Sequence, residues 1–107
     1  MEFDIFSLKG FERSYLKRIA HSLDPIVMIG QAGLTPGVID AFDQALNHHE
    51  LVKVRFQDYK EDRKILFQEA CQKASAQFVG LIGNIGIAFR HNYDLEQRIR
   101  LPKRKEA

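Results

Sequence analysis

The chain contains a single cysteine, Cys71, among its 107 residues. One cysteine excludes both an internal disulfide and a metal site built from several thiolates, so nothing in the sequence requires an oxidising compartment. Cys71 falls on the apolar stripe of a predicted helix, and no activating base is apparent for it. We therefore predict that Cys71 is a buried core thiol and not a nucleophile.

Long apolar segments are also absent. No hydrophobic run approaches the length of a membrane span. Residues 1–6 include two acidic residues and no basic one, which is unlike a signal peptide. We expect a cytoplasmic protein that has no membrane partner.

The residue combinations that support catalysis are missing as well. No serine or cysteine has a plausible base and orienting acid, and no pair of carboxylates marks an obvious cleft. His48 and His49 are adjacent, so on a helix their side chains point about 100° apart and cannot easily share a metal. We predict a protein that is not an enzyme and that needs no metal, cofactor or small-molecule substrate.

The most informative segment is residues 24–37, which has the pattern of a strand, a glycine loop and a helix start. Residues 26–29 are a short apolar run, and Gly30 and Gly33 follow it. Thr35 is a good N-cap because its hydroxyl can accept a hydrogen bond from a first-turn amide, and proline is favoured at the next position. A helix is expected to begin at Pro36.

Two interpretations of this glycine loop stay open at this point. Unpaired backbone N–H groups at a helix start, with few side chains in front of them, suit an anion. Alternatively, Gly30 and Gly33 supply only the positive φ of a tight turn. The loop is not a Walker A motif, because no lysine lies between Gly30 and Pro36.

Hydrophobic periodicity predicts the other elements. Helices are expected at residues 8–21, 36–49 and between 58 and 77, and strands at 26–29, 51–56, 78–82 and 85–89. The first two strands should be parallel through a right-handed crossover, and the last two should form a hairpin whose glycines, Gly83 and Gly86, serve turn geometry. The predicted fold is a compact single α/β domain of order αβαβαββ, in which helices pack on a four-stranded mixed sheet.

Basic residues are unevenly distributed, although the net charge is only +2. They recur on one face of the first helix and on the outer face of the second strand, whereas no lysine or arginine lies between Leu34 and Glu50. Such rows usually mark a solvated face, and phosphate contact is the functional alternative. Residues 98–107 form a basic tail that we expect to be poorly ordered, either a solvated terminus or a phosphate-contacting arm.

Two blocks of sequence carry a resemblance to a known family: LDPIVMIGQAGLTPGV at residues 23–38 and QALNHHELVKV at residues 44–54. With looser matches at 82–90 and 99–104, the chain resembles the CRM domain family (chloroplast RNA splicing and ribosome maturation) in its stand-alone bacterial YhbY-type form. The chain departs mildly from the family pattern at Gln31-Ala32, where a charged or polar pair is usual, and at Phe89, where tyrosine is frequent.

The resemblance implies a fold similar to the C-terminal domain of bacterial translation initiation factor three, with a loop like the phosphate-gripping G-x-x-G of KH domains. It also implies association with precursors of the large ribosomal subunit. The family domain would cover residues 1–97, with 1–7 as a short extension. Carried over by position or taken from the basic surfaces, the predicted RNA-binding residues are Gly30, Gln31, Ala32, Gly33, Leu34, Thr35, Lys9, Arg13, Lys17, Arg18, Lys53, Arg55 and Arg90.

Our sequence-based hypothesis is therefore a monomeric RNA-binding assembly factor that contacts the phosphate backbone of precursor rRNA. The first alternative is a protein-interaction module whose basic face docks an acidic ribosomal protein or GTPase. The second is a small phosphate-handling enzyme that uses the helix start, which would need a general base or metal near Thr35.

Overall fold

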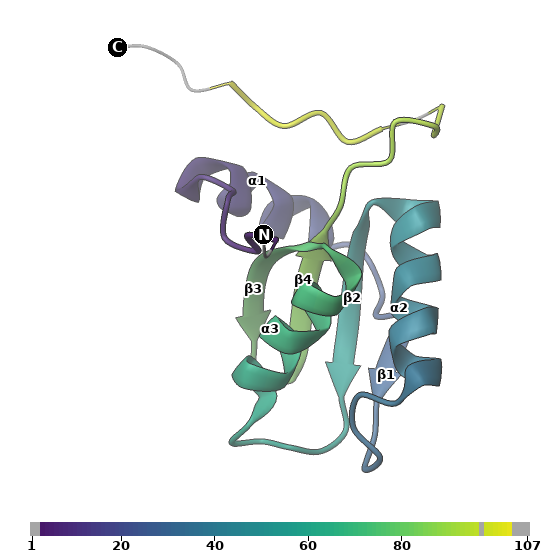
Figure 1. Ribbon diagram of the computed structural model, residues 1–107. Coiled ribbons are helices and arrows are strands. Elements are labelled where there is room, and N and C mark those ends of the chain that lie inside the picture. The colour runs from purple at the N-terminus through teal and green to yellow at the C-terminus, as the bar shows by residue number, and fades with distance from the viewer. Residues whose placement is uncertain (1–2, 97, 104–107) are drawn as a thin grey trace.

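The structure of the protein, a computed structural model, describes residues 3–96 and 98–103. Figure 1 shows seven elements in the predicted order, and their bounds are α1 Gly10–Ala20, β1 Val27–Ile29, α2 Pro36–His49, β2 Leu51–Phe56, α3 Arg63–Ala74, β3 Gln77–Ile82 and β4 Ile85–Phe89. The bounds of α2, β2 and β4 match the prediction to the residue, and the remaining ends differ by a few residues. The single α/β domain of order αβαβαββ is confirmed.

The four strands form one mixed sheet in the order β1-β2-β4-β3. β1 and β2 are parallel, with Val27 opposite Val54, and α2 connects them. β4 is antiparallel to both of its neighbours, so β3 and β4 form the predicted hairpin. Consequently β1 and β3 are the two edge strands.

One face of the sheet is covered by α2 and α3, which lie side by side in front of it in Figure 1. Phe42 and Leu46 of α2 and Phe67 and Cys71 of α3 pack there on alternate residues of the strands, among them Val54. All five side chains are almost completely buried. Alternation along each strand therefore places the main core on this face.

The opposite face is only partly covered, because α1 crosses it at one end. Leu16 and Ala20 of α1 pack on Leu51, Ile87 and Phe89. The rest of that face is open and carries large exposed apolar side chains, since Met28 is 47% and Ile82 is 61% exposed. Within the described residues, no helix is long and apolar enough to cross a membrane.

The second G-x-x-G pair has two separate causes. Gly83 has φ +59 and turns the hairpin, as predicted. Gly86 has no positive φ; instead, a Cβ there would lie 2.7 Å from ring atoms of the buried Phe67. Gly86 is thus needed for close packing of α3 on the sheet, which the turn-geometry prediction did not foresee.

Both terminal segments are attached to the domain where they are described. Ile5 is buried, and its carbonyl accepts a hydrogen bond from the Phe78 amide at the β3 edge (2.8 Å). Ile99 and Leu101 pack against the cluster between α1 and the sheet. Residues 98–103 are therefore held in place, contrary to the expected poorly ordered tail, while residues 104–107 lie outside the described part.

Candidate nucleic-acid interface

The loop between β1 and α2 is a tight turn that presents its backbone. The Gly33 amide donates to the Gly30 carbonyl at 3.0 Å, and Gly33 has φ +73, a left-handed conformation that glycine adopts without strain. Gln31 and Ala32, at the tip, are exposed. The turn-geometry interpretation is thus correct for Gly33, and it does not exclude a binding role.

Tyr59 fastens this loop from the segment between β2 and α3. Its hydroxyl donates to the carbonyl of Gln31, and a Cβ added at Gly33 would lie 3.4 Å from that hydroxyl. Tyr59 itself has φ +62. The tyrosine therefore holds the loop tip against the body of the domain, a role that the sequence patterns did not reveal.

The start of α2 has the expected cap. The Thr35 hydroxyl accepts from the Val38 amide at 3.1 Å, and the Thr35 carbonyl accepts from Ile39 at 3.0 Å. Other amides of this region have no hydrogen-bond partner among the described residues. They are the N–H groups of Gln31, Ala32, Leu34 and Gly37.

These free donors give the loop the backbone geometry of an anion-binding site. They gather around the N-terminus of a helix of 14 residues, where the helix dipole adds a positive potential. Figure 1 places the loop at the bottom of the view, beside the segment that joins β2 and α3. A phosphate oxygen could accept from several of the amides without meeting a bulky side chain.

The basic residues of α1 do not surround this loop. α1 packs on β2 and β3 at the end of the sheet away from it, at the top of Figure 1. Arg13 donates to the carbonyl of Leu8, and the Lys9 amide is bonded to Glu12 (2.8 Å). Lys9, Arg13 and Arg18 are therefore separated from the loop that they were expected to flank.

Strand β2 links the loop to α1 through the open face of the sheet. Arg55 is exposed there and lies one residue before Phe56, the partner of Ile29 in the ladder. Lys53, two residues before Arg55 on the same strand, borders a shallow hollow of about 160 Å³ together with Lys17. Lys17, Lys53 and Arg55 thus form a basic row, which we call the sheet-face row.

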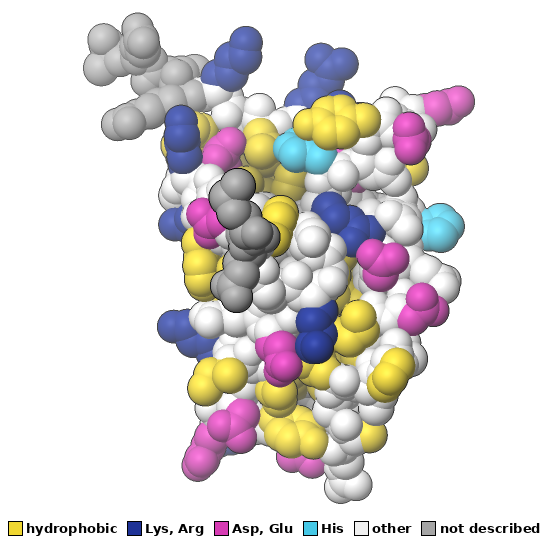
Figure 2. All heavy atoms as spheres, viewed as in Figure 1, with side chains coloured by type: hydrophobic (Ala, Val, Ile, Leu, Met, Phe, Trp, Pro, Cys, Tyr) yellow, Lys and Arg dark blue, Asp and Glu magenta, His cyan; other side chains and the backbone are white. Residues whose placement is uncertain are grey.

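The sheet-face row is bordered by apolar side chains and one histidine. Ile82, Ile85 and Ile87 of the hairpin line the same hollow, and His21 lies at its edge. The Lys53 ammonium donates to the carbonyl of Leu23 at 2.9 Å. The opposite, helical face differs, because in Figure 2 acidic side chains are interspersed with basic ones over α2 and α3.

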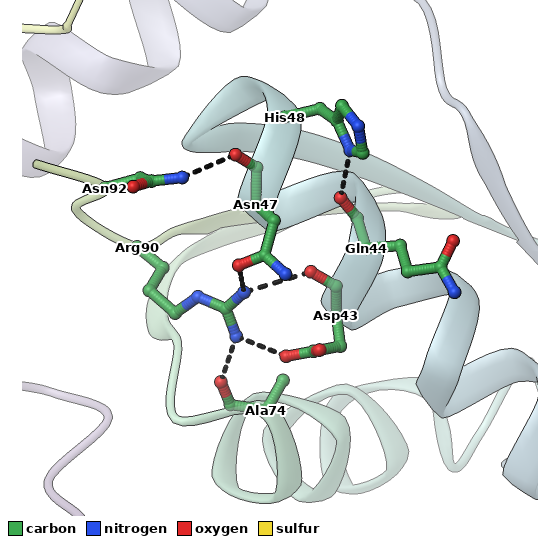
Figure 3. A network of polar contacts seen from close by, with 7 residues as sticks. All are labelled: Asp43, Gln44, Asn47, His48, Ala74, Arg90 and Asn92. Carbon is green, nitrogen blue, oxygen red and sulfur yellow. Dashed lines mark hydrogen bonds and ion pairs between the residues drawn. The ribbon is translucent and has the colours of Figure 1, made fainter. Parts of the chain in front are cut away.

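Arg90, also predicted to contact RNA, is engaged by the protein itself (Figure 3). One terminal nitrogen donates to Asp43 Oδ1 and to the Ala74 carbonyl, both at 2.7 Å. The other donates to the Asp43 carbonyl at 2.9 Å and to Asn47 Oδ1 at 2.7 Å. Its side chain is 20% exposed, so it fastens the end of β4 to α2 and α3. RNA contact by Arg90 stays a prediction on which the proposal below does not rest.

Glu50 forms a second network that sequence reasoning missed. It is 1% exposed, and its two carboxylate oxygens accept from the amides of Asn92 (2.9 Å) and Ile99 (2.8 Å). Arg98 Nε lies 3.6 Å from the carboxylate. In the sequence, the only signal at Glu50 was its position at the end of a predicted helix. That position does not identify hydrogen-bond partners that lie more than forty residues away in the chain.

Cys71 and His48, which were considered above for catalysis and metal binding, both interact with other parts of the protein. Burial raises the pKa of the Cys71 thiol from 9.0 to about 12, as suits the predicted core thiol. His48 Nδ1 lies 2.7 Å from the carbonyl of Gln44 on the same helix. Over the residues that the structure describes, no group of three potential metal ligands is found.

Comparisons with known proteins agree with this architecture. The family model of the CRS1 / YhbY (CRM) domain matches residues 8–90. The "RNA-binding protein" of Haemophilus influenzae is 36% identical over 99 residues, which are 92% of this chain and 98% of that protein. "Probable RNA-binding protein PA4753" of Pseudomonas aeruginosa is 34% identical over 82 residues, 76% of this chain and 79% of that one.

A solved structure shows the same fold. The solution structure of the hypothetical protein SAV1595 of Staphylococcus aureus superimposes with a TM-score of 0.77 at 31% sequence identity. The match covers 89% of this chain and 99% of that one. The matches thus span most of this chain and most of each relative.

Proposed function

The chain belongs to the CRS1 / YhbY (CRM) domain family, and from that premise we propose that it binds RNA through the sugar–phosphate backbone. The observation that carries the proposal is the set of unpaired amides of Gln31, Ala32, Leu34 and Gly37, within the described residues, at the capped start of α2. Such amides recognise phosphate in any sequence, so the loop would position RNA and not select bases.

The sheet-face row would extend this contact. Lys53 and Arg55 of β2 lie on the partly covered side of the sheet, with Lys17 of α1 beside them, where a second stretch of backbone could be neutralised. Among the basic residues predicted to assist the loop, Arg55 and Lys53 are thus favoured over Lys9, Arg13 and Arg18.

The finer part of the proposal concerns the target. We infer that the RNA is precursor rRNA of the large ribosomal subunit and that the protein acts as a monomeric, non-enzymatic assembly factor in the cytoplasm. This step is supported by the family resemblance of residues 23–38 and 44–54. Crosslinking in cells, followed by sequencing of the attached RNA, would identify the target directly.

Replacing Gly33 by aspartate tests the loop. Gly33→Asp places a negative charge among the free amides and should weaken binding to structured rRNA fragments by about tenfold or more, since a charge-assisted contact contributes about 1.5–3 kcal/mol. The left-handed backbone adds a stability cost of about 1–2 kcal/mol, so circular dichroism must show a folded variant. Unchanged affinity in a folded Gly33→Asp protein would refute the loop as the phosphate site.

Gly83→Asp is the matched control. Gly83 also has positive φ, and a Cβ added there would meet no other atom within 4 Å, but this glycine turns a hairpin and opens no helix. The same substitution therefore adds the same charge and a similar backbone strain without occupying the amide cluster. Its effect on affinity should be much the smaller of the two.

One observation favours a second function, a protein-interaction module that docks an acidic partner. Ile26, Met28 and Ile82 are large apolar side chains about half exposed on or beside the open sheet face, next to Arg55 and Lys53. Apolar surface with a basic rim suits an acidic protein such as a ribosomal protein or GTPase. Nuclease treatment of a captured complex separates the two functions, because a protein partner should remain bound.

A further inference from the structure

A series of aromatic rings leads from the core to the surface along the segment that follows β4 in the chain. Phe89 is completely buried, and the ring of His91 meets it edge-on at a centroid distance of 4.7 Å. The ring of Tyr93 stacks on His91 at 5.5 Å with an interplanar angle of 26°. Tyr93 is 75% exposed, so the last ring of the series faces solvent.

The contacts of Arg98 show which face of Tyr93 is open. Its guanidinium carbon lies 3.9 Å from the Tyr93 ring centroid, and Nη2 lies 3.1 Å from His91 Nδ1. A group that reaches both rings must lie on the same side of Tyr93 as His91. The opposite face of the tyrosine ring is therefore left uncovered by these two partners.

Glu50 stabilises this arrangement from the side of the core. The buried carboxylate lies 3.6 Å from Arg98 Nε and also accepts the amides of Asn92 and Ile99, on either side of the tyrosine in the chain. The guanidinium that lies against Tyr93 is thus close to a carboxylate that is fixed in the core. A ring held in this way loses little conformational freedom when a flat ligand stacks on it.

The surroundings favour a nucleobase as that ligand. Arg98 places positive charge against the ring, and in the chain the exposed Arg100 and Lys103 follow it while the exposed Asp94 and Glu96 precede it. A single aromatic ring backed by a guanidinium is small for a protein docking surface, whereas base stacking on such rings is a regular feature of single-stranded RNA binding.

We propose that the open face of Tyr93 is a stacking site for one base of a single-stranded RNA segment, with His91 and Arg98 as its support. The inference rests on the proposed RNA-binding function and adds a second contact of a different kind. The site follows β4 at the top of Figure 1, whereas the loop of residues 30–33 is at the bottom. Bound RNA would therefore extend along the domain, held by its phosphates at one end and by a base at the other.

The chain contains no tryptophan, which allows a direct test. Tyr93→Trp introduces one fluorophore at the site, and a stacked base should quench its emission. The control is Gln44→Trp, on the exposed outer side of α2 beside Asp40. We expect oligoadenylate to quench the Tyr93→Trp protein but not the Gln44→Trp protein, and an abasic ribose-phosphate chain of equal length to quench neither.

Affinity provides the second measurement. Tyr93→Ala should weaken oligoadenylate binding about tenfold, within the range known for loss of one stacked base, while Tyr93→Phe should bind like the parent protein. Binding to the abasic chain should be equal for all three proteins. If the protein binds RNA but shows neither quenching in Tyr93→Trp nor loss of affinity in Tyr93→Ala, the stacking site alone is refuted.

The two proposals can fail separately. If the parent protein binds neither oligoadenylate nor structured rRNA fragments, the RNA-binding function itself is wrong, and the stacking site falls with it. If Tyr93→Ala instead abolishes capture of a nuclease-resistant protein partner while RNA binding is unaffected, the exposed ring belongs to a protein interface and the stacking proposal is refuted.

Discussion

At its N-terminal end α2 leaves the amides of Gln31, Ala32 and Leu34 unpaired within the described structure, whereas at its C-terminal end polar groups are bonded to distant parts of the chain. There, Asp43 holds Arg90 and Glu50 holds the segment after β4. One helix therefore has an end with unused donors and an end with satisfied acceptors.

The difference has a physical cause and a consequence. At the satisfied end the Glu50 carboxylate is buried, and buried polar groups must be paired because each unpaired one costs about 1–3 kcal/mol. The loop end is exposed, so water can serve its amides until a ligand displaces that water. We conclude that the C-terminal end of α2 stabilises the fold and that the N-terminal end is free to bind.

The largest expected effect of a single substitution is at Glu50. Glu50→Ala removes the acceptor of two backbone amides and the partner of Arg98, and it should lower the free energy of unfolding by about 3 kcal/mol or more. Glu50→Gln, which keeps one acceptor, should lie between the parent and the alanine variant. Urea denaturation measures both values.

Cys71 offers an independent measurement of the same loss. Its buried thiol, whose pKa is raised to about 12, should be alkylated only through opening of the fold, so Glu50→Ala should accelerate alkylation in proportion to the unfolded population. Substitutions at the loop, which cost less stability, should accelerate it less. A Glu50→Ala protein as stable as the parent would show that the C-terminal end of α2 is not a structural anchor.

Arg90 and Arg55 form the next test, because both are arginines and only one is committed to the fold. Arg90→Met loses the donors that reach Asp43, Asn47 and Ala74, so stability should fall by about 1–3 kcal/mol. The dependence of RNA affinity on salt should be unchanged.

Arg55→Ala should behave in the opposite way. Because Arg55 is exposed on β2, its loss should change stability little and should flatten the logarithmic salt dependence of RNA affinity by about one phosphate contact. If Arg90→Met flattens that dependence and remains fully stable, Arg90 is an RNA contact, as the sequence predicted, and the contrast between the two ends of α2 is weakened.

Local signals in the sequence were sufficient for the fold. Thr35 and Pro36 marked the first residue of α2, and strict alternation from Leu51 to Phe56 marked β2 to the residue. Both signals involve neighbours in the chain, where helix caps and strand periodicity are encoded directly. The mixed sheet then followed from the order of the elements.

The site was predictable only in part, because its remaining contacts join distant residues. Tyr59 meets Gln31 across 28 positions, and no periodicity links them. The sequence alone does not distinguish Arg90 from Arg55. Only the packing of α2 and α3 reveals that the hydrogen-bond donors of Arg90 are used within the protein. Likewise, the sequence identified the basic row of α1, but its distance from the loop depends on which end of the sheet α1 covers.

The smallest expected effect is at Tyr59, and it tests whether the free amides at the loop must be held in place. Tyr59→Phe removes one hydrogen bond to Gln31 and should cost about 1 kcal/mol or less in stability. RNA affinity should fall by a few fold with an unchanged salt dependence, because no charge is altered. Tyr15→Phe, on α1, is the matched control and should change neither quantity. Should Tyr59→Phe lose stability but retain full affinity, the loop would bind phosphate without preorganisation, and the contrast between the ends of α2 would concern exposure alone.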